Sequence, residues 1–285
     1  MGDFMNKIVS ALPNTRSNRF MLPARLRRHA VRTFFHLLCL AVGFHPSHGI
    51  AETLTVMSSG GYTAALEKLA PQFEAQTGHT IKIVLGPSMG TAPEAIPIRL
   101  ERGEKADVLF MVGSAIEPLV TKKLVLAETR KDLARSKIAM AIKEGQPKPD
   151  ISTLDQFKAS LLKAKSIAYS DSASGVYIEN EMYKKLGLEA ELKPKSKMII
   201  AERVGNVVAR GDAEIGFQQV SELLPVKGIT YVGTIPDDVQ KVTVFSAVIT
   251  TNTSNSKLAD MLLTFLTSPS SLKIVNETGI EAIAP

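Results

Sequence analysis

Strand-like runs that end in turns of small residues, each followed by a helical pattern, recur along this chain and constrain its fold most strongly. Residues 54–57 form one such run, which leads into Ser58-Ser59-Gly60-Gly61 and a helical pattern at 62–73. Residues 166–170 form another, which leads into Asp171-Ser172-Ala173-Ser174-Gly175. Alternating strands and helices predict an α/β fold with mostly parallel sheets that helices flank.

The same alternation extends over most of the chain. Further strands are expected at 81–85, 106–112, 137–142, 215–217 and 241–250, and further helices at 93–101, 153–163, 176–186, 202–210 and 257–266. Pro97 is expected to bend or shorten its helix. The 285 residues suit one large domain or two lobes, and no fixed-period repeat is present.

The first 51 residues differ from the rest in charge. They hold seven basic residues and one acid, whereas residues 52–285 hold 27 of each, so the basic excess is no sign of a nucleic-acid surface. A basic stretch at 25–32, an apolar run at 33–44 and the small residues before the end of the segment predict a secretory signal. Cleavage is expected near Ala51, with Met21 as an alternative start, and the periplasm as destination. An uncleaved anchor is disfavoured, because a membrane span needs ~20 apolar residues.

Removal of that segment would limit the chemistry of the remaining chain. His79 would be the one histidine left, and no cysteine would remain, since Cys39 lies in the apolar run. A zinc site of His and Cys ligands and a cysteine nucleophile are therefore excluded. A serine triad would need His79, which lies in a turn pattern. No metal and no organic cofactor is expected.

Three turns have the composition of an anion site. They are the two named above and the looser Ser88-Met89-Gly90-Thr91. Small residues let backbone N–H groups approach a ligand, a helix start adds unpaired donors and positive charge, and serine adds hydroxyls. The alternative is ordinary helix capping. The candidate ligand contacts from these turns are Ser58, Ser59, Gly60, Ser88, Met89, Ser172 and Ser174.

The chain resembles the periplasmic molybdate-binding proteins, within the solute-binding proteins of ATP-driven importers. Four segments carry the resemblance over 53–283: 58–65, 88–108, 174–187 (Ser174-Gly175-Val176-Tyr177 and Lys185-Leu186-Gly187) and 201–216 (Ala201-Glu202-Arg203-Val204 and Ala213-Glu214-Ile215-Gly216). The resemblance implies two α/β lobes, 52–137 with 247–285 and 138–246, joined by two crossing strands that act as a hinge. It also implies a small anionic ligand in the cleft, an importer permease as partner, and a monomer.

Carried over residue by residue, the oxyanion contacts of that family fall on four positions. They are Ser59 or its neighbours, Ser88, and the backbones of Ser174 and Val204. This chain has Gln219 where the family has a tyrosine, and Arg203 lies beside the site, with Gln218 as a further amide. An arginine matches a carboxylate through two parallel hydrogen bonds, which favours an organic anion. The alternative is that Arg203 pairs with Glu202 or Glu214 at the surface.

A narrower resemblance is to the branch of bacterial aconitate isomerases. Gly86-Pro87-Ser88-Met89-Gly90-Thr91, residues 170–175 and residues 201–205 carry it. It implies an exported, cofactor-independent enzyme that interconverts cis- and trans-aconitate, a tricarboxylate. A binding protein that only carries an oxyanion or an organic acid to an importer remains the second reading. A hydrolase is disfavoured, because no Gly-x-Ser-x-Gly elbow is present.

Such an isomerisation needs a base, and several candidates compete. Glu202, Asp171 and Tyr62 are the proposed acid–base residues, and Tyr177 is expected to wall the pocket. Burial beside a bound anion would raise the pKa of a carboxyl toward neutrality, as proton transfer requires. Each residue also has a structural alternative: an acid opens a helix favourably at Glu202, and Asp171 can act as a cap.

Overall fold

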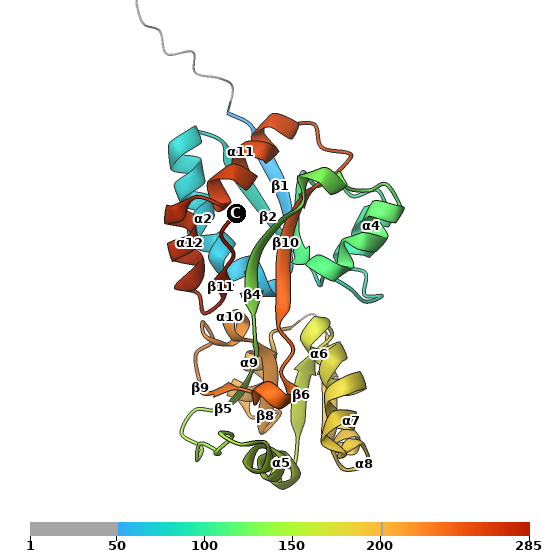
Figure 1. The fold of residues 1–285 in the computed structure, drawn as a ribbon, viewed down its shortest axis with the longest axis vertical. Helices are drawn as coiled ribbons and strands as arrows, with labels where there is room; N and C mark the ends of the chain where they lie inside the picture. Colours follow the sequence, from blue (N-terminus) through green and yellow to red (C-terminus); the bar gives the residue numbers. More distant parts are fainter. Residues whose placement is uncertain (1–50, 201) are drawn as a thin grey trace, which may run out of the picture. The chain divides into compact units, whose positions relative to one another are not determined.

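A computed structural model describes residues 51–200 and 202–285 (Figure 1). The predicted signal segment and its cleavage point near Ala51 therefore lie largely outside the described residues, as does Ala201. None of the helices in the described part combines the length and apolar character that crossing a membrane requires.

Two mixed β-sheets organise the structure. The first has the order β11-β4-β10-β3-β1-β2, and the second has the order β7-β6-β8-β5-β9. The strands of the first sheet are β1 (Thr53–Ser58), β2 (Thr80–Leu85), β3 (Val108–Val112), β4 (Lys131–Ser136), β10 (Thr243–Ile249) and β11 (Glu281–Ala282). Those of the second are β5 (Ile138–Lys143), β6 (Ile167–Ser170), β7 (Ser196–Ile199), β8 (Ile215–Gln219) and β9 (Ile229–Thr234).

The two-lobed α/β fold is confirmed, but the sheets are not mostly parallel. In the first sheet β1 runs parallel to β2 and β3, whereas β10 runs antiparallel to β3 and β4. In the second, β6 runs parallel to β7 and β8, whereas β5 runs antiparallel to β8 and β9. The antiparallel pairs arise where the chain crosses between the two sheets. Strand β4 continues into β5 of the second sheet through Lys137 alone, and β10 later returns to the first sheet beside β4.

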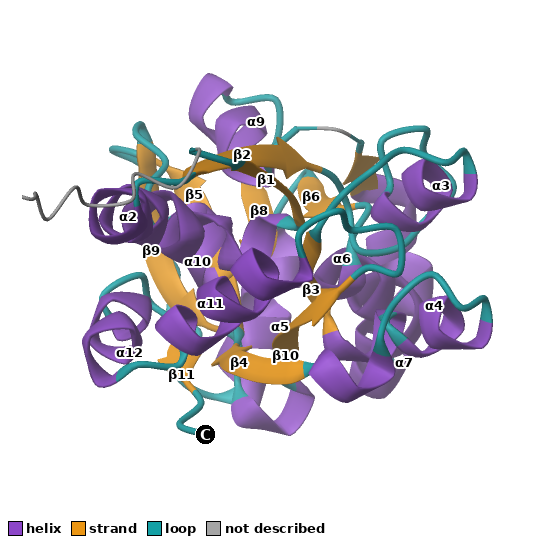
Figure 2. Cartoon of the chain, turned by 90° about the horizontal axis from the view of Figure 1, so that it is seen from above, coloured by secondary structure: helices purple, strands orange, loops and turns teal. Residues whose placement is uncertain are grey.

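Helices cover both faces of the sheets (Figure 2). They are α2 (Gly60–Thr77), α3 (Ile96–Glu101), α4 (Glu117–Thr121), α5 (Leu154–Lys163), α6 (Ala173–Tyr177), α7 (Tyr183–Leu186), α8 (Glu189–Leu192), α9 (Val204–Arg210), α10 (Val220–Leu223), α11 (Ser256–Leu266) and α12 (Pro269–Asn276). A π-helical segment, Ile178–Met182, joins α6 to α7, and single 3₁₀ turns lie at Gly113–Ala115, Ala127–Thr129, Lys193–Lys195 and Asp237–Val239.

Local sequence explains most of these elements, although four helices start two or three residues away from the expected position. Gly78 ends α2 in the left-handed conformation, with φ of 73°, where glycine avoids the Cβ clash. Pro97 lies in the first turn of α3, so it begins that helix at Ile96 instead of bending one that starts at 93. The other differences are α9, which begins at Val204 and not at 202, α2, which begins at Gly60 and not at 62, and α6, which begins at Ala173 and not at 176.

Each sheet has apolar cores on both sides. In the first lobe one core packs β1, β3 and β10 against α2 and α11, and a second core packs the opposite face against α3 and α4. In the other lobe α5, α6 and α7 cover one face of the second sheet and α9 covers the other. Every residue of β3 is buried, which agrees with its continuous apolar sequence. Two rigid sheets thus present their strand ends to a shared cleft.

Candidate functional site

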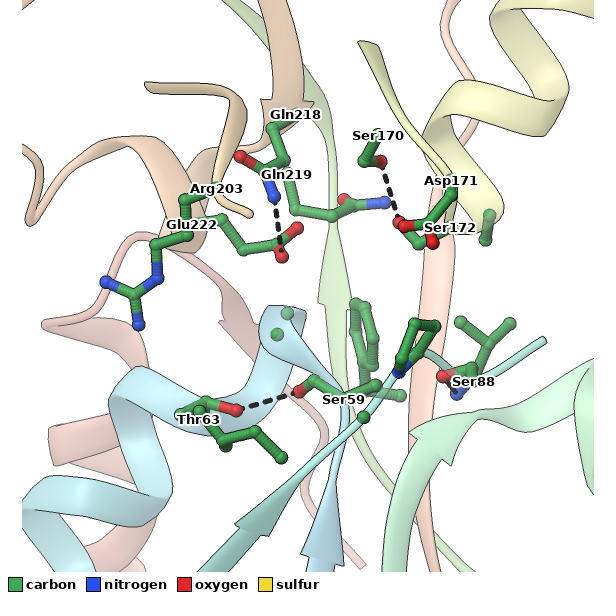
Figure 3. Close-up of a pocket in the computed structure, with 18 of the residues that line it drawn as sticks. Ser59, Thr63, Ser88, Ser170, Asp171, Ser172, Arg203, Gln218, Gln219 and Glu222 are labelled. Carbon is green, nitrogen blue, oxygen red and sulfur yellow. Dashed lines mark hydrogen bonds between the residues drawn. The ribbon is translucent and has the colours of Figure 1, made fainter. Parts of the chain in front are cut away.

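A cavity of about 220 Å³ lies where strand ends of the two sheets meet (Figure 3). Its lining comes from the carboxyl ends of β1, β2 and β3 in the first sheet and of β6 and β8 in the second. The lining residues are Ser59, Gly60, Gly61, Thr63, Leu85, Gly86, Pro87, Ser88, Glu94, Val112, Ser170, Asp171, Ser172, Ala173, Glu202, Arg203, Gln218, Gln219, Glu222 and Phe245. Ligands of open α/β sheets bind at these carboxyl ends.

The start of α2 supplies one hydrogen-bond donor to this cavity. Ser59 precedes the helix in an extended conformation, and its side chain does not cap it. Its Oγ is buried and has no hydrogen-bond partner among the described residues. The helix is 18 residues long, so its first N–H groups carry the positive end of a full helix dipole. An unpaired hydroxyl beside that end is suited to an anion.

Ser88 supplies a second donor from the loop after β2. Its Oγ accepts a hydrogen bond of 2.9 Å from the backbone N–H of Val112, and the residue is buried. Because that bond uses an oxygen lone pair, the hydroxyl hydrogen remains available to a ligand. The third predicted turn therefore reaches the cavity, although the helix after it begins only at Ile96.

The opposite wall is the turn after β6. Ser170 Oγ lies 2.8 Å from Ser172 Oγ and 3.2 Å from Ser174 Oγ, so these hydroxyls bond to one another. A Cβ on Gly175 would lie 1.6 Å from the carbonyl oxygen of Ser170, which explains why glycine stands there. The helical segment that begins at Ala173 continues through the π-helical turn to Leu186, so this turn adds the positive end of a helix dipole to its hydroxyls and Asp171.

Two glutamines from β8 form the floor between these walls. Gln218 Oε1 accepts the backbone N–H of Val204 at 2.9 Å, and Gln218 Nε2 donates to Glu222 Oε1 at 2.9 Å. The Val204 N–H, a predicted ligand contact, is therefore bonded to a side chain of the cavity floor, and the contact with a ligand stays a prediction. Gln219 Nε2 donates to Thr243 Oγ1 at 3.1 Å, and Gln219 Oε1 is buried without a partner among the described residues.

Arg203 is a cation at the cavity margin that forms no ion pair within residues 51–200 and 202–285. The surface pairing with Glu202 or Glu214 is wrong for both acids. Glu202 binds Arg210, with one N–O distance of 3.1 Å, and the Glu214 carboxylate accepts the backbone N–H of Lys165 at 2.8 Å. The half-buried Arg203 guanidinium thus remains available to a ligand carboxylate.

Glu222, in α10, is a buried acid of the cavity lining that the sequence did not single out. It is only 7% exposed, and this burial raises the pKa of its carboxyl to about 7. The backbone N–H of Gln219, the charge of Arg203 and the Gln218 amide act in the opposite direction. One signal was present: Gln218 and Glu222 are four residues apart, in a segment that follows a cleft strand.

Asp171 and Glu94 add further negative charge. Asp171 is half-buried, and desolvation raises the pKa of its carboxyl, with a smaller increase from the charge of Glu94. Glu94 itself is exposed. In the part of the chain that the structure describes, no three His, Cys, Asp or Glu side chains are grouped as a metal ion would need.

Glu202 and Tyr62, two of the predicted acid–base residues, are poorly placed for that role. Glu202 lies at the exposed rim, and its hydrogen bond with Arg210 lowers the pKa of its carboxyl. Tyr62 does not line the cavity: its ring stacks on Phe110 at 5.6 Å, and burial raises the pKa of its hydroxyl. The first turn of α2 directs Tyr62 into the core of the first lobe.

Three predicted ligand contacts point elsewhere. Ser58 Oγ bonds to the backbone of Ser59. The Ser174 side chain is buried against Ser170, and the ligand contact from the Ser174 backbone stays a prediction. Tyr177 donates its hydroxyl hydrogen to the Val239 carbonyl at 2.8 Å, and Met89 packs against the first-lobe core. The structure brings together the remaining predicted contacts, which are Ser59, Gly60, Ser88, Ser172, Arg203, Gln218 and Gln219, with Asp171 beside them.

Known proteins are similar to this chain in sequence and in fold. The family model described as bacterial extracellular solute-binding protein matches residues 54–281. An aconitate isomerase from a Pseudomonas species is 47% identical over 231 residues, which cover 81% of this chain and 88% of that protein. A molybdate-binding protein of Escherichia coli is 24% identical over 79% of this chain and 88% of its own length.

Solved structures agree on the architecture. The periplasmic molybdate-binding protein of Azotobacter vinelandii superposes with a TM-score of 0.65 at 23% identity, over 81% of this chain and 99% of that one. A sulfate-binding protein of Mycobacterium tuberculosis has a TM-score of 0.65 at 16% identity, over 82% and 88%. The family match and the 47% identical relative show that this chain belongs to the bacterial extracellular solute-binding proteins.

Proposed function

We propose that this protein is an aconitate isomerase, which binds the tricarboxylate in its cleft and interconverts the cis and trans forms by proton transfer. The observation that carries the proposal is the 47% identity to an aconitate isomerase over most of both chains. The cavity supports it, because anion donors, the buried carboxyl of Glu222 and the half-buried carboxyl of Asp171 line the same space.

The donors suit a small molecule with several carboxylates. Ser59 and the start of α2 lie on one side, Ser88 on a neighbouring loop, and Arg203 at the margin. Hydrogen bonds to ionised groups are about twice as strong as neutral ones, and arginine can hold a carboxylate through two of them. The volume of about 220 Å³ lies below the ~300–1,000 Å³ of pockets for drug-sized ligands. A compact tricarboxylate fits this combination of size and charge.

The reaction is a proton shift along three carbons. A base takes a proton from the methylene carbon beside the double bond, so a C–H bond breaks and an O–H bond forms on the base. The electron pair spreads over the allylic carbons and the attached carboxylate. The same proton, or one from solvent, then returns to the former vinyl carbon, and the double bond moves into its new position. Donors aimed at the substrate carboxylates stabilise the charge that develops.

A transport role without catalysis is the second candidate, and the family match favours it. A tetrahedral oxyanion fits this cavity less well than an organic acid. The Arg203 guanidinium, which forms no ion pair among the described residues, matches a planar carboxylate through two parallel hydrogen bonds. Gln219 also replaces the tyrosine that the resemblance implies.

Location and partners belong to the same proposal. Residues 1–51 would direct export to the periplasm, where the monomeric protein works without a metal or an organic cofactor. An importer permease would dock on it only if the transport role holds. The membership in an extracellular family supports the export part of this proposal.

A proton NMR time course tests the function. The purified protein is mixed with trans-aconitate in D₂O, and cis-aconitate signals are followed together with deuterium entering the methylene group. We expect both signals to grow. Broadened ligand lines without conversion would overturn the isomerase and leave a carboxylate-binding protein. If neither occurs, calorimetric titration with molybdate and sulfate decides whether the oxyanion alternative replaces the proposal.

A further inference from the structure

We infer that Glu222 is the base that takes and returns the allylic proton, and that Gln218 and Gly60 position its carboxylate for this task. This inference rests on the proposed isomerase function. It replaces Glu202, Asp171 and Tyr62 as the leading candidate for the base.

Burial separates Glu222 from the other carboxyls of the cavity. Glu94 and Glu202 are exposed, and Asp171 is half-buried, whereas Glu222 is 7% exposed and still lines the cavity. Water solvates exposed carboxylates and keeps them weakly basic. A base that must remove a proton from carbon needs the stronger basicity that desolvation provides. Glu222 meets this requirement best.

A chain of hydrogen bonds holds the Glu222 carboxylate in place. The backbone N–H of Val204 fixes Gln218 Oε1, and Gln218 Nε2 holds Glu222 Oε1, with both distances 2.9 Å. The amide of Gln218 therefore cannot rotate without losing one bond. Figure 3 shows the carboxylate directed from the second lobe toward the first. This orientation is what a general base requires before substrate arrives.

Gly60 allows the carboxylate to reach the start of α2. A Cβ at position 60 would lie 1.9 Å from Glu222 Oε1, so any other residue would push the carboxylate away. Ser221 Oγ donates to the Gly61 carbonyl at 2.7 Å and ties α10 to α2 across the lobes. The carboxylate therefore lies beside the donors that would hold a substrate carboxylate, within reach of the neighbouring carbon.

Burial and the charged groups that face Glu222 together place the pKa of its carboxyl near neutral pH. Burial raises the pKa of its carboxyl to about 7, Arg203 at the start of α9 lowers it, and Asp171 at the end of β6 raises it. A carboxyl with a pKa close to the working pH can both accept a proton and give it back. The C–H bond is broken as the Glu222 O–H bond forms, and the reverse step delivers that proton, or one exchanged with solvent on the carboxyl, to the other end of the allylic system.

Glu222→Gln tests the inference against two other variants. Glu189→Gln is the matched control, because that carboxylate is paired with Lys193 on an exposed helix away from the cavity. Asp171→Asn tests the competing base. For each protein, kcat for isomerisation, trans-aconitate affinity by calorimetry and deuterium uptake into the methylene group are measured. We expect Glu222→Gln to lose roughly 10²–10⁴-fold in kcat and in deuterium uptake, with affinity nearly retained, and Glu189→Gln to match the wild type.

The outcomes separate this inference from the proposed function. A wild type that converts no aconitate overturns the function itself. An active wild type with an active Glu222→Gln variant overturns the inference alone, as does loss of exchange in Asp171→Asn but not in Glu222→Gln.

Arg203→Gln provides a test that leaves Glu222 in place. Loss of the positive charge should raise the pKa of Glu222, so the acidic limb of kcat/KM should move to higher pH. An unmoved limb, in a variant that still turns over, contradicts the assignment.

Discussion

The buried carboxyl of Glu222 should make the ligand-free protein less stable as the pH rises, and Glu222→Gln should remove that dependence. Burial raises its pKa from 4.5 to about 7 in the folded state. Each pKa unit corresponds to ~1.36 kcal/mol, so ionisation costs the folded state about 3 kcal/mol. Because the folded pKa is raised, the full stability is present below pH 4.5. It is lost progressively as the pH rises through about 7.

Urea unfolding of both proteins without ligand, at pH 4.5, 6 and 8, measures this effect. Between the extremes, the free energy of unfolding of the wild type should fall by about 3 kcal/mol relative to Glu222→Gln. At roughly 2–4 °C per kcal/mol for a protein of this size, the melting temperatures should diverge by about 6–12 °C. Unfolding curves from two spectroscopic probes must coincide for the comparison to hold.

Glu189→Gln is the control with the opposite sign. The carboxylate of Glu189, which is half-buried at the surface, has a pKa lowered first by its hydrogen bond to Lys193. Any stability that it adds is present above its unfolded pKa and disappears as the pH falls. A constant difference between the wild type and Glu222→Gln from pH 4.5 to 8 would refute the reasoning, because it would mean that water reaches the carboxyl freely.

Three further substitutions have expected outcomes. Ser59→Ala should weaken trans-aconitate binding by roughly 10- to 100-fold in calorimetry, since a hydrogen bond to a charged group is worth about 1.5–3 kcal/mol. The melting temperature without ligand should stay within about 1 °C, because the Ser59 Oγ has no protein partner among the described residues. Gly60→Ala should lower kcat at least ~10-fold with the fold retained in circular dichroism, because the new Cβ meets only the flexible end of Glu222. Gly175→Ala should destabilise the protein by more than ~2 kcal/mol in urea unfolding, because the Ser170 carbonyl 1.6 Å away belongs to the backbone and cannot move aside easily.

Local patterns in the sequence predicted the architecture well. Apolar runs followed by Ser/Gly turns located the strands and helices around Ser59 and Ser172, and the resemblance implied two lobes with a cleft. Mixed sheets were harder to predict, because the direction of β10 and β5 depends on which lobe the chain enters next. No local sequence pattern encodes the direction of these two strands.

The cavity lining shows where sequence reasoning ends. A small-residue turn after a strand determines by itself that a backbone can approach a ligand there, which is why Ser59 and Ser88 were found. Only the tertiary structure decided that Tyr62 turns into the core and that Gln218 takes the Val204 N–H. The tertiary structure also decided that Glu222 lies buried against Gly60, which is 162 positions earlier in the chain. No sequence pattern had singled out Glu222. The basicity of a carboxyl depends on which groups surround it and exclude water, and here those groups come from both lobes.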